Sequence, residues 1–154
     1  MTKEANPERV ALLVAALRSG DYEQVQGRLA VTVATKDGVE QWKYCCLGVA
    51  CEVAIANGVE VPVAMLQNPG APFVLRSYDN GIVSLPRQVG DWFGFSSDDP
   101  MIDVNVDSDP SFPLRNVSAT HANDSIGLSF AQIADAFERT YITKENNEEN
   151  STPA

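Results

Sequence analysis

Apolar residues recur every three or four positions in three segments of the chain, near residues 7–19, 46–57 and 129–141. This spacing places them on one face of a helix. The first segment opens with Asn6-Pro7, which supplies an N-cap and a proline at the first helical position. The last opens with a capping box made by Ser129 and Gln132. The pattern therefore predicts three helices, each with an apolar face to bury.

Two other stretches are typical of β-hairpins. Residues 29–34 and 39–44 are rich in β-formers and flank a turn signal, and residues 73–78 and 82–85 flank Asp79-Asn80-Gly81. The proline-marked segment 59–72 is predicted to be a loop. Further predictions are a short helix from Pro86 to near Trp92, an acidic loop over 96–113 with a short strand at 101–106, and a helical turn at 117–122.

These elements predict an α+β fold in which a small antiparallel sheet of two hairpins is packed by about three helices. The chain has 154 residues, enough for one core, so residues 1–142 are expected to form a single domain. Residues 143–154 are polar and acidic, and we expect a disordered tail there.

Charge narrows the set of partners. The formal net charge is -10, which repels bulk nucleic acid and anionic membrane surfaces. No window approaches the roughly 18 to 20 apolar residues of a membrane span. The first residues lack a signal-peptide pattern, so we expect a cytoplasmic protein.

Three pieces of the chain, with a weaker middle segment, resemble a family of small proteins of tailed bacteriophages. The pieces are Leu17-Arg18-Ser19-Gly20-Asp21-Tyr22 with Gln24, Gly27 and Leu29; Tyr44-Cys45-Cys46-Leu47-Gly48-Val49-Ala50-Cys51; and Asn123-Asp124, Gly127-Leu128-Ser129-Phe130, Ile133-Ala134-Asp135 and Glu138. The middle segment contains Leu85-Pro86, Val89, Trp92 and Gly94. The resemblance implies action in the host cytosol on host functions or defences, and it implies no particular mechanism.

The cysteines offer one candidate chemistry. Cys45 and Cys46 stand at a predicted helix N-terminus, where the helix dipole favours the thiolate. His121, the sole histidine, is then the candidate base, with Asn123 and Asp124 to orient it. The alternative is buried packing, since cysteine is among the most buried residue types. A cluster of three close cysteines is a poor disulfide framework.

No metal or cofactor is predicted. The cysteine spacing lacks a Cys-x-x-Cys pair for zinc. Asp103-x-Asn105-x-Asp107 begins like a calcium loop, but Ser108 and Leu114 stand where that loop needs glycine and glutamate. The chain also lacks a glycine-rich phosphate loop.

A ligand site is the other candidate. Arginine forks bind phosphate and tyrosine rings stack on bases. The candidate ligand-binding residues are Arg28, Tyr44, Arg76, Tyr78, Asn123 and Asp124. They favour a small ligand such as a nucleotide signal.

Three hypotheses follow. In the favoured one, a phage-type accessory protein counters host defence by sequestering a small ligand or by blocking a host protein. The second is a cysteine-dependent hydrolase or transferase. The third is an acidic decoy that binds a basic host protein through residues 98–109. A homo-oligomer is compatible with each.

Overall fold

The structure is a computed structural model that describes residues 5–35, 38–39, 41–67, 70–106 and 113–143. The elements in chain order are α1 (Pro7–Arg18), β1 (Glu23–Gln24), β2 (Ala30–Thr35), β3 (Gly38–Val39), β4 (Lys43–Tyr44), α2 (Cys46–Ala56), β5 (Val63–Leu66), β6 (Phe73–Tyr78), α3 (Arg87–Phe93), β7 (Met101–Val104), β8 (Arg115–Ser118), the π-helical η1 (His121–Ile126), α4 (Phe130–Glu138) and the π-helical η2 (Arg139–Thr143). The α+β prediction is confirmed.

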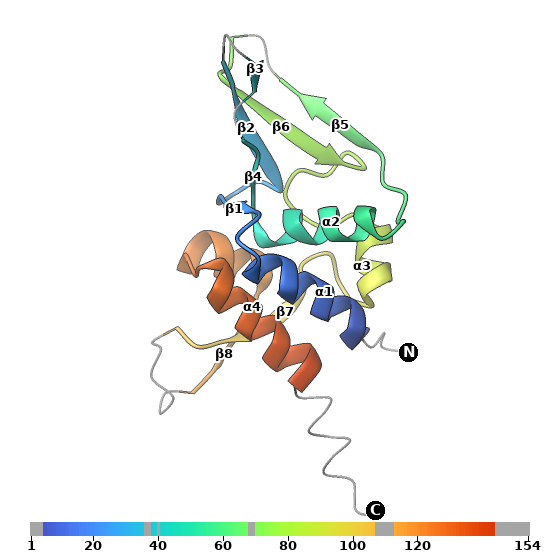
Figure 1. Ribbon diagram of the computed structural model, residues 1–154. Helices are drawn as coiled ribbons and strands as arrows, with labels where there is room; N and C mark the ends of the chain where they lie inside the picture. The colour runs from blue at the N-terminus through green and yellow to red at the C-terminus, as the bar shows by residue number, and fades with distance from the viewer. Residues whose placement is uncertain (1–4, 36–37, 40, 68–69, 107–112, 144–154) are drawn as a thin grey trace, which may run out of the picture.

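The main sheet lies on one side of α2, and α1 and α4 lie on the other side (Figure 1). Its strand order is β1-β4-β2-β6-β5, with β3 paired to β2. The β1–β4 pair is parallel, so the prediction of a purely antiparallel sheet is wrong. Strands β7 and β8 form a separate antiparallel pair. None of the described helices is long and apolar enough to cross a membrane.

The second predicted hairpin, of residues 73–78 with 82–85, is not formed. Asp79 and Asn80 both adopt positive φ, as a tight turn after β6 requires. The returning chain makes only the single bridge Tyr78↔Gly81, because Ile82 turns away and its carbonyl accepts a hydrogen bond from Leu29 N at 2.7 Å. The strand beside β6 is instead β5, from the segment predicted to be a loop.

The predicted helices are found at close to the predicted ends. The Asn6 cap and the Ser129–Gln132 capping box are both formed. The last helix is interrupted, since α4 ends at Glu138 and η2 continues to Thr143. The helical turn predicted at 117–122 is wrong at its first two residues, 117–118, which belong to β8. Residues 144–154 of the predicted tail lie outside the described residues.

Helix α2 is central to the core, and eight of its eleven residues are buried. Its Gly48 lies so close to the bend that precedes β2 that an added Cβ would sit 1.8 Å from the Leu29 carbonyl oxygen. This close approach brings α2 near the inner face of the sheet, so side chains of α2 can reach that face.

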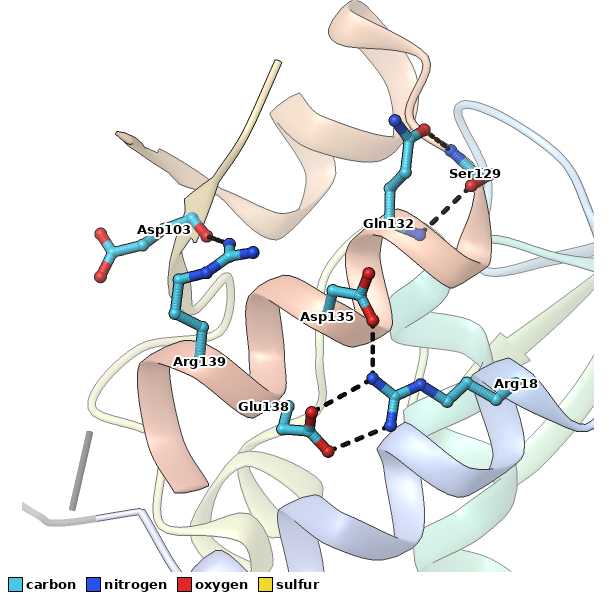
Figure 2. A network of polar contacts seen from close by, with 7 residues as sticks. All are labelled: Arg18, Asp103, Ser129, Gln132, Asp135, Glu138 and Arg139. Carbon is cyan, nitrogen blue, oxygen red and sulfur yellow. Dashed lines mark hydrogen bonds and ion pairs between the residues drawn. The ribbon is translucent and has the colours of Figure 1, made fainter. Parts of the chain in front are cut away.

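On the far side of α2, an ion-pair network joins α1 to α4 (Figure 2). Arg18 Nη2 lies 2.6 Å from Asp135 Oδ1, and Arg18 Nη1 lies 3.0 Å from Glu138 Oε2. One turn further along, Arg139 Nη1 donates to the Asp103 carbonyl at 2.6 Å, which ties the end of α4 to β7. These contacts are exposed or half-buried, and they hold the helical layer together.

Candidate functional site

Asn123 in η1 is completely buried and every part of its amide is bonded. Its Oδ1 accepts from Gln24 Nε2 at 2.9 Å and from the backbone N–H of Cys46 at 3.3 Å. Its Nδ2 donates to the Val25 carbonyl at 2.9 Å and to Asp124 Oδ1 at 2.8 Å. Helix α2 has no side-chain cap of its own at Cys45, so Asn123 satisfies one of its open N–H groups from 77 residues away.

Three segments that are far apart in the sequence meet around Asn123 and Asp124. Asp124 Oδ1 accepts from Gly27 N at 2.9 Å, and Gln24 Nε2 also donates to the Leu128 carbonyl at 2.8 Å. The close approach of Gly48 to Leu29 lies beside two of these segments. Asn123 and Asp124, predicted as ligand or orienting residues, are therefore engaged in holding these segments together.

The thiols lie in the core. Cys45, Cys46 and Cys51 are all buried, and Cys46 Sγ donates to the Ala119 carbonyl at 3.6 Å. Burial raises the pKa of Cys45 to about 11, although the backbone N–H groups of Gly48 and Leu47 act in the opposite direction. The pKa values of Cys46 and Cys51 are raised as well, chiefly by burial. The expectation of a lowered thiol pKa is wrong, because loss of solvent outweighs the helix N-terminus.

His121 lies apart from this chemistry. Its side chain is exposed, whereas both thiols predicted to work with it are buried. Asn123, the predicted orienting group, directs its amide to Gln24, Val25 and the start of α2. The structure thus gives the cysteine-enzyme hypothesis neither an accessible nucleophile nor an oriented base among the residues it was built on.

A second polar cluster, the Glu52 cluster, lies between α2 and the inner face of the sheet. It consists of Glu52 on α2, Arg76 and Tyr78 on β6, and the tyrosine pair Tyr22 and Tyr44. Tyr78 OH donates to Glu52 Oε2 at 2.7 Å, and Arg76 Nη2 lies 3.4 Å from the same oxygen. The Arg76 guanidinium also lies 5.5 Å from the centre of the Tyr78 ring. Two of the predicted ligand residues are therefore in contact.

Tyr44 belongs to the same neighbourhood. It pairs with Ala30 in the sheet register, and its ring meets that of Tyr22 edge-on with centroids 5.3 Å apart. Burial and the nearby Glu52 carboxylate raise the pKa of Tyr44, and Arg76 opposes that shift. The pKa of Tyr78 is raised by burial and by its hydrogen bond to Glu52. Tyr44, Arg76 and Tyr78 are thus electrostatically coupled through one carboxylate.

Arg76 has a buried donor that meets no acceptor in the described part of the chain. Its Nε is buried, and among the described residues it has no hydrogen-bond partner. An unpaired buried donor costs about 1 to 3 kcal/mol, so an acceptor brought by a ligand would recover that energy. The side chains of Arg76 and Glu52 are 23% and 19% exposed, so part of the cluster reaches solvent although Arg76 Nε itself is buried.

The remaining predicted groups lie elsewhere. Arg28 is exposed and donates to the Gly27 carbonyl beside it. In the acidic segment, Asp99 accepts from the Thr120 backbone and hydroxyl, and Asp103 accepts from Asn116. Asp107 and Asp109 lie outside the described residues. Within the described part of the chain, no group of three or more His, Cys, Asp or Glu side chains is arranged to hold a metal ion.

Glu52 was missed by sequence reasoning. The signal was present, because it is the one charged residue within the otherwise apolar helix α2. A carboxylate in such a helix is kept only where a partner compensates its charge. That reasoning could have pointed to Glu52, but the partners Arg76 and Tyr78 are 24 and 26 residues away and depend on the fold.

Most of the chain matches a known protein family. Residues 6–141 match the family described as a domain of unknown function, DUF8296. The chain belongs to the DUF8296 family. No curated protein and no solved structure matches the chain. The matched range of the DUF8296 domain runs from the N-cap of α1 into η2, and so contains Asn123 and the whole Glu52 cluster.

Proposed function

We propose that this DUF8296 domain is a non-catalytic binding protein that holds a small planar ligand, such as a nucleotide, at the Glu52 cluster. The observation that carries the proposal is the buried Arg76 Nε, which has no partner among the described residues and lies beside Tyr78 and Glu52. The buried, weakly acidic thiols support binding over turnover.

The charge of the cluster selects which part of a ligand it contacts. Glu52 already compensates the charge of Arg76, and it would repel a phosphate placed against it. A neutral acceptor, such as a ring nitrogen or a carbonyl of a base, suits Arg76 Nε better. The exposed part of the Tyr22–Tyr44 pair offers aromatic surface for the planar body of the ligand. The base, rather than the phosphate, is therefore the recognised group.

The setting is also part of the proposal. The segments that resemble proteins of tailed bacteriophages support action in the cytosol of an infected host, and sequestration of a nucleotide signal would counter host defence there. Sequestration requires tight stoichiometric binding and no catalytic group. The Glu52 cluster offers hydrogen-bonding and stacking groups without a free nucleophile among the residues predicted to supply one.

The test is native mass spectrometry of the protein with a panel of linear and cyclic nucleotides and the matching nucleosides. We expect an adduct whose mass does not change with time, and we expect nucleosides to compete with nucleotides. Arg76→Gln should weaken binding at least tenfold. Arg87→Gln removes the same charge from a side chain that is 92% exposed and should leave binding unchanged.

Two results would contradict the proposal. One is a protein that ignores the whole panel; the other is Arg76→Gln binding as tightly as the unchanged chain. A shift from adduct mass to product mass would instead identify an enzyme.

A further inference from the structure

We propose that strand β5 is the interface of a homodimer in which two copies of the chain pair antiparallel through this edge and continue one sheet. In the described sheet, β5 is the last strand beside β6 and its other side has no neighbouring strand. This inference does not depend on the proposed ligand.

The composition of β5 is unusual for an edge strand. Val63, Met65 and Leu66 are exposed at 39%, 62% and 46%, and the strand Val63–Leu66 contains no charged residue. Isolated domains protect their edges with charges, bulges or prolines inside the strand, because an open edge pairs with other chains. Here Pro62 precedes the strand and leaves all four of its residues able to pair.

The backbone of β5 indicates what pairs with this edge. Alternate residues of β5 direct their backbone N–H and C=O groups away from β6, and only another extended strand satisfies such a row. A second copy of β5 is complementary, because a twofold axis perpendicular to the sheet makes the pair antiparallel and keeps each face of the sheet continuous. Residues opposite one another then lie on the same face.

If the twofold axis passes between the two copies of Met65, Ala64 of each chain lies opposite Leu66 of the other. These Met65 and Ala64–Leu66 pairs are the central pairs, and Pro62 lies beyond them. Every side chain of the central pairs then meets an apolar one. Charge favours the same choice of surface, because a chain of net charge -10 repels its copy least where it carries no charged side chain. Phe73, exposed at 44% on neighbouring β6, extends the apolar surface beside the edge.

Sedimentation equilibrium tests the proposal on the full chain and two variants. We expect the unchanged protein to have twice the 16.7 kDa mass of one chain. Met65→Lys should convert it to monomers by placing like charges together at the axis. Met101→Lys introduces the same charge at another exposed methionine, at 46%, and should leave the dimer intact. A monomeric unchanged protein, or a dimer that survives Met65→Lys, would overturn the proposal.

A disulfide cross-link checks the register of the pair, and it also captures a dimer that associates weakly. Residues facing each other across a twofold axis in an antiparallel pair have Cα atoms about 4.5 to 5.5 Å apart, within reach of a disulfide. The native thiols are buried, so Met65→Cys adds an accessible one. Mild oxidation should link Met65→Cys into covalent dimers and leave Met101→Cys monomeric on a denaturing gel. Equal cross-linking of both, or of neither, would refute the pairing.

Discussion

Gly48→Ala should destabilise the domain strongly, although alanine is the better helix former. The added Cβ would sit 1.8 Å from the Leu29 carbonyl oxygen, and real Cβ contacts do not fall below 3.0 Å. Helix α2 and the bend at Leu29 must therefore separate by at least 1.2 Å, the difference between these distances. Leu29 is poorly able to move, because it is buried and its N–H donates to the Ile82 carbonyl at 2.7 Å.

The magnitude follows from two opposing contributions. Forcing extra volume into a packed core costs about 3 kcal/mol at the upper end of the usual range, and here the obstacle is backbone. Replacing glycine by alanine inside a helix returns about 1 kcal/mol. The expected net loss is about 2 kcal/mol of the free energy of unfolding, a large part of the roughly 5 to 15 kcal/mol of a typical domain.

The assay is urea unfolding followed by tryptophan fluorescence. With a slope near 2 kcal/mol per molar urea, the midpoint should fall by about 1 M. Gly90→Ala is the matched control, because Gly90 is also a buried helical glycine but its added Cβ would meet only the Ser97 carbonyl, at an ordinary 3.7 Å. That variant should be as stable as the unchanged chain or more stable. A Gly48→Ala midpoint at or above the unchanged one would refute the reasoning.

Three further predictions concern the buried polar groups and the thiols. Asn123→Asp keeps the shape of the side chain but sets a carboxylate against Asp124 and the Val25 carbonyl; it should lower the free energy of unfolding by about 3 kcal/mol at neutral pH, and an unchanged urea midpoint would contradict the structural role. Ser129→Ala removes the cap of α4 and should cost about 1 kcal/mol in the same assay, whereas Ser129→Asn should largely restore it. The pKa of Cys45 is about 11 in the folded chain against 9.0 for an ordinary thiol, so ionisation of this thiol favours the unfolded state. Its contribution to the free energy of unfolding should fall by about 2 kcal/mol between pH 9 and 11, and the raised pKa values of Cys46 and Cys51 act in the same direction. Iodoacetamide labelling of the native protein at pH 8 should remain slow until denaturant is added. Rapid labelling of one cysteine in the native state would contradict the raised thiol pKa and would support the cysteine-enzyme hypothesis.

Local signals in the sequence predicted the helices well. The Asn6 and Ser129 caps and the Asp79-Asn80-Gly81 turn each depend on residues within four positions, and all three form where predicted. Strand β5 was missed because all four of its residues are exposed, so its sequence has no buried alternation, and only its pairing with β6 makes it a strand. Pairing between distant segments is not encoded in local periodicity.

The candidate site shows the same division. Tyr44, Arg76 and Tyr78 were predicted to bind a ligand for their residue types, and the fold brings them near the Glu52 carboxylate; their role in binding stays a prediction. Asn123 and Asp124 have equally suitable chemistry, but the fold uses them to join distant segments. Sequence identifies what a side chain can do; burial and the number of bonds already made determine whether it is available.

The ion pairs of Arg18 with Asp135 and Glu138 span 117 and 120 residues of sequence. During synthesis at about 5 to 20 residues per second, α1 must wait roughly 6 to 24 seconds before α4 exists to cover it. Helices α2 and α3 contact α1 as well and are made earlier, so the apolar face of α1, with Val10, Leu13, Val14 and Leu17, is only partly covered during that interval. The domain therefore cannot be completed until α4 has been synthesised, and a chain that stops before α4 lacks the helix that covers part of α1, which makes it more open to proteolysis.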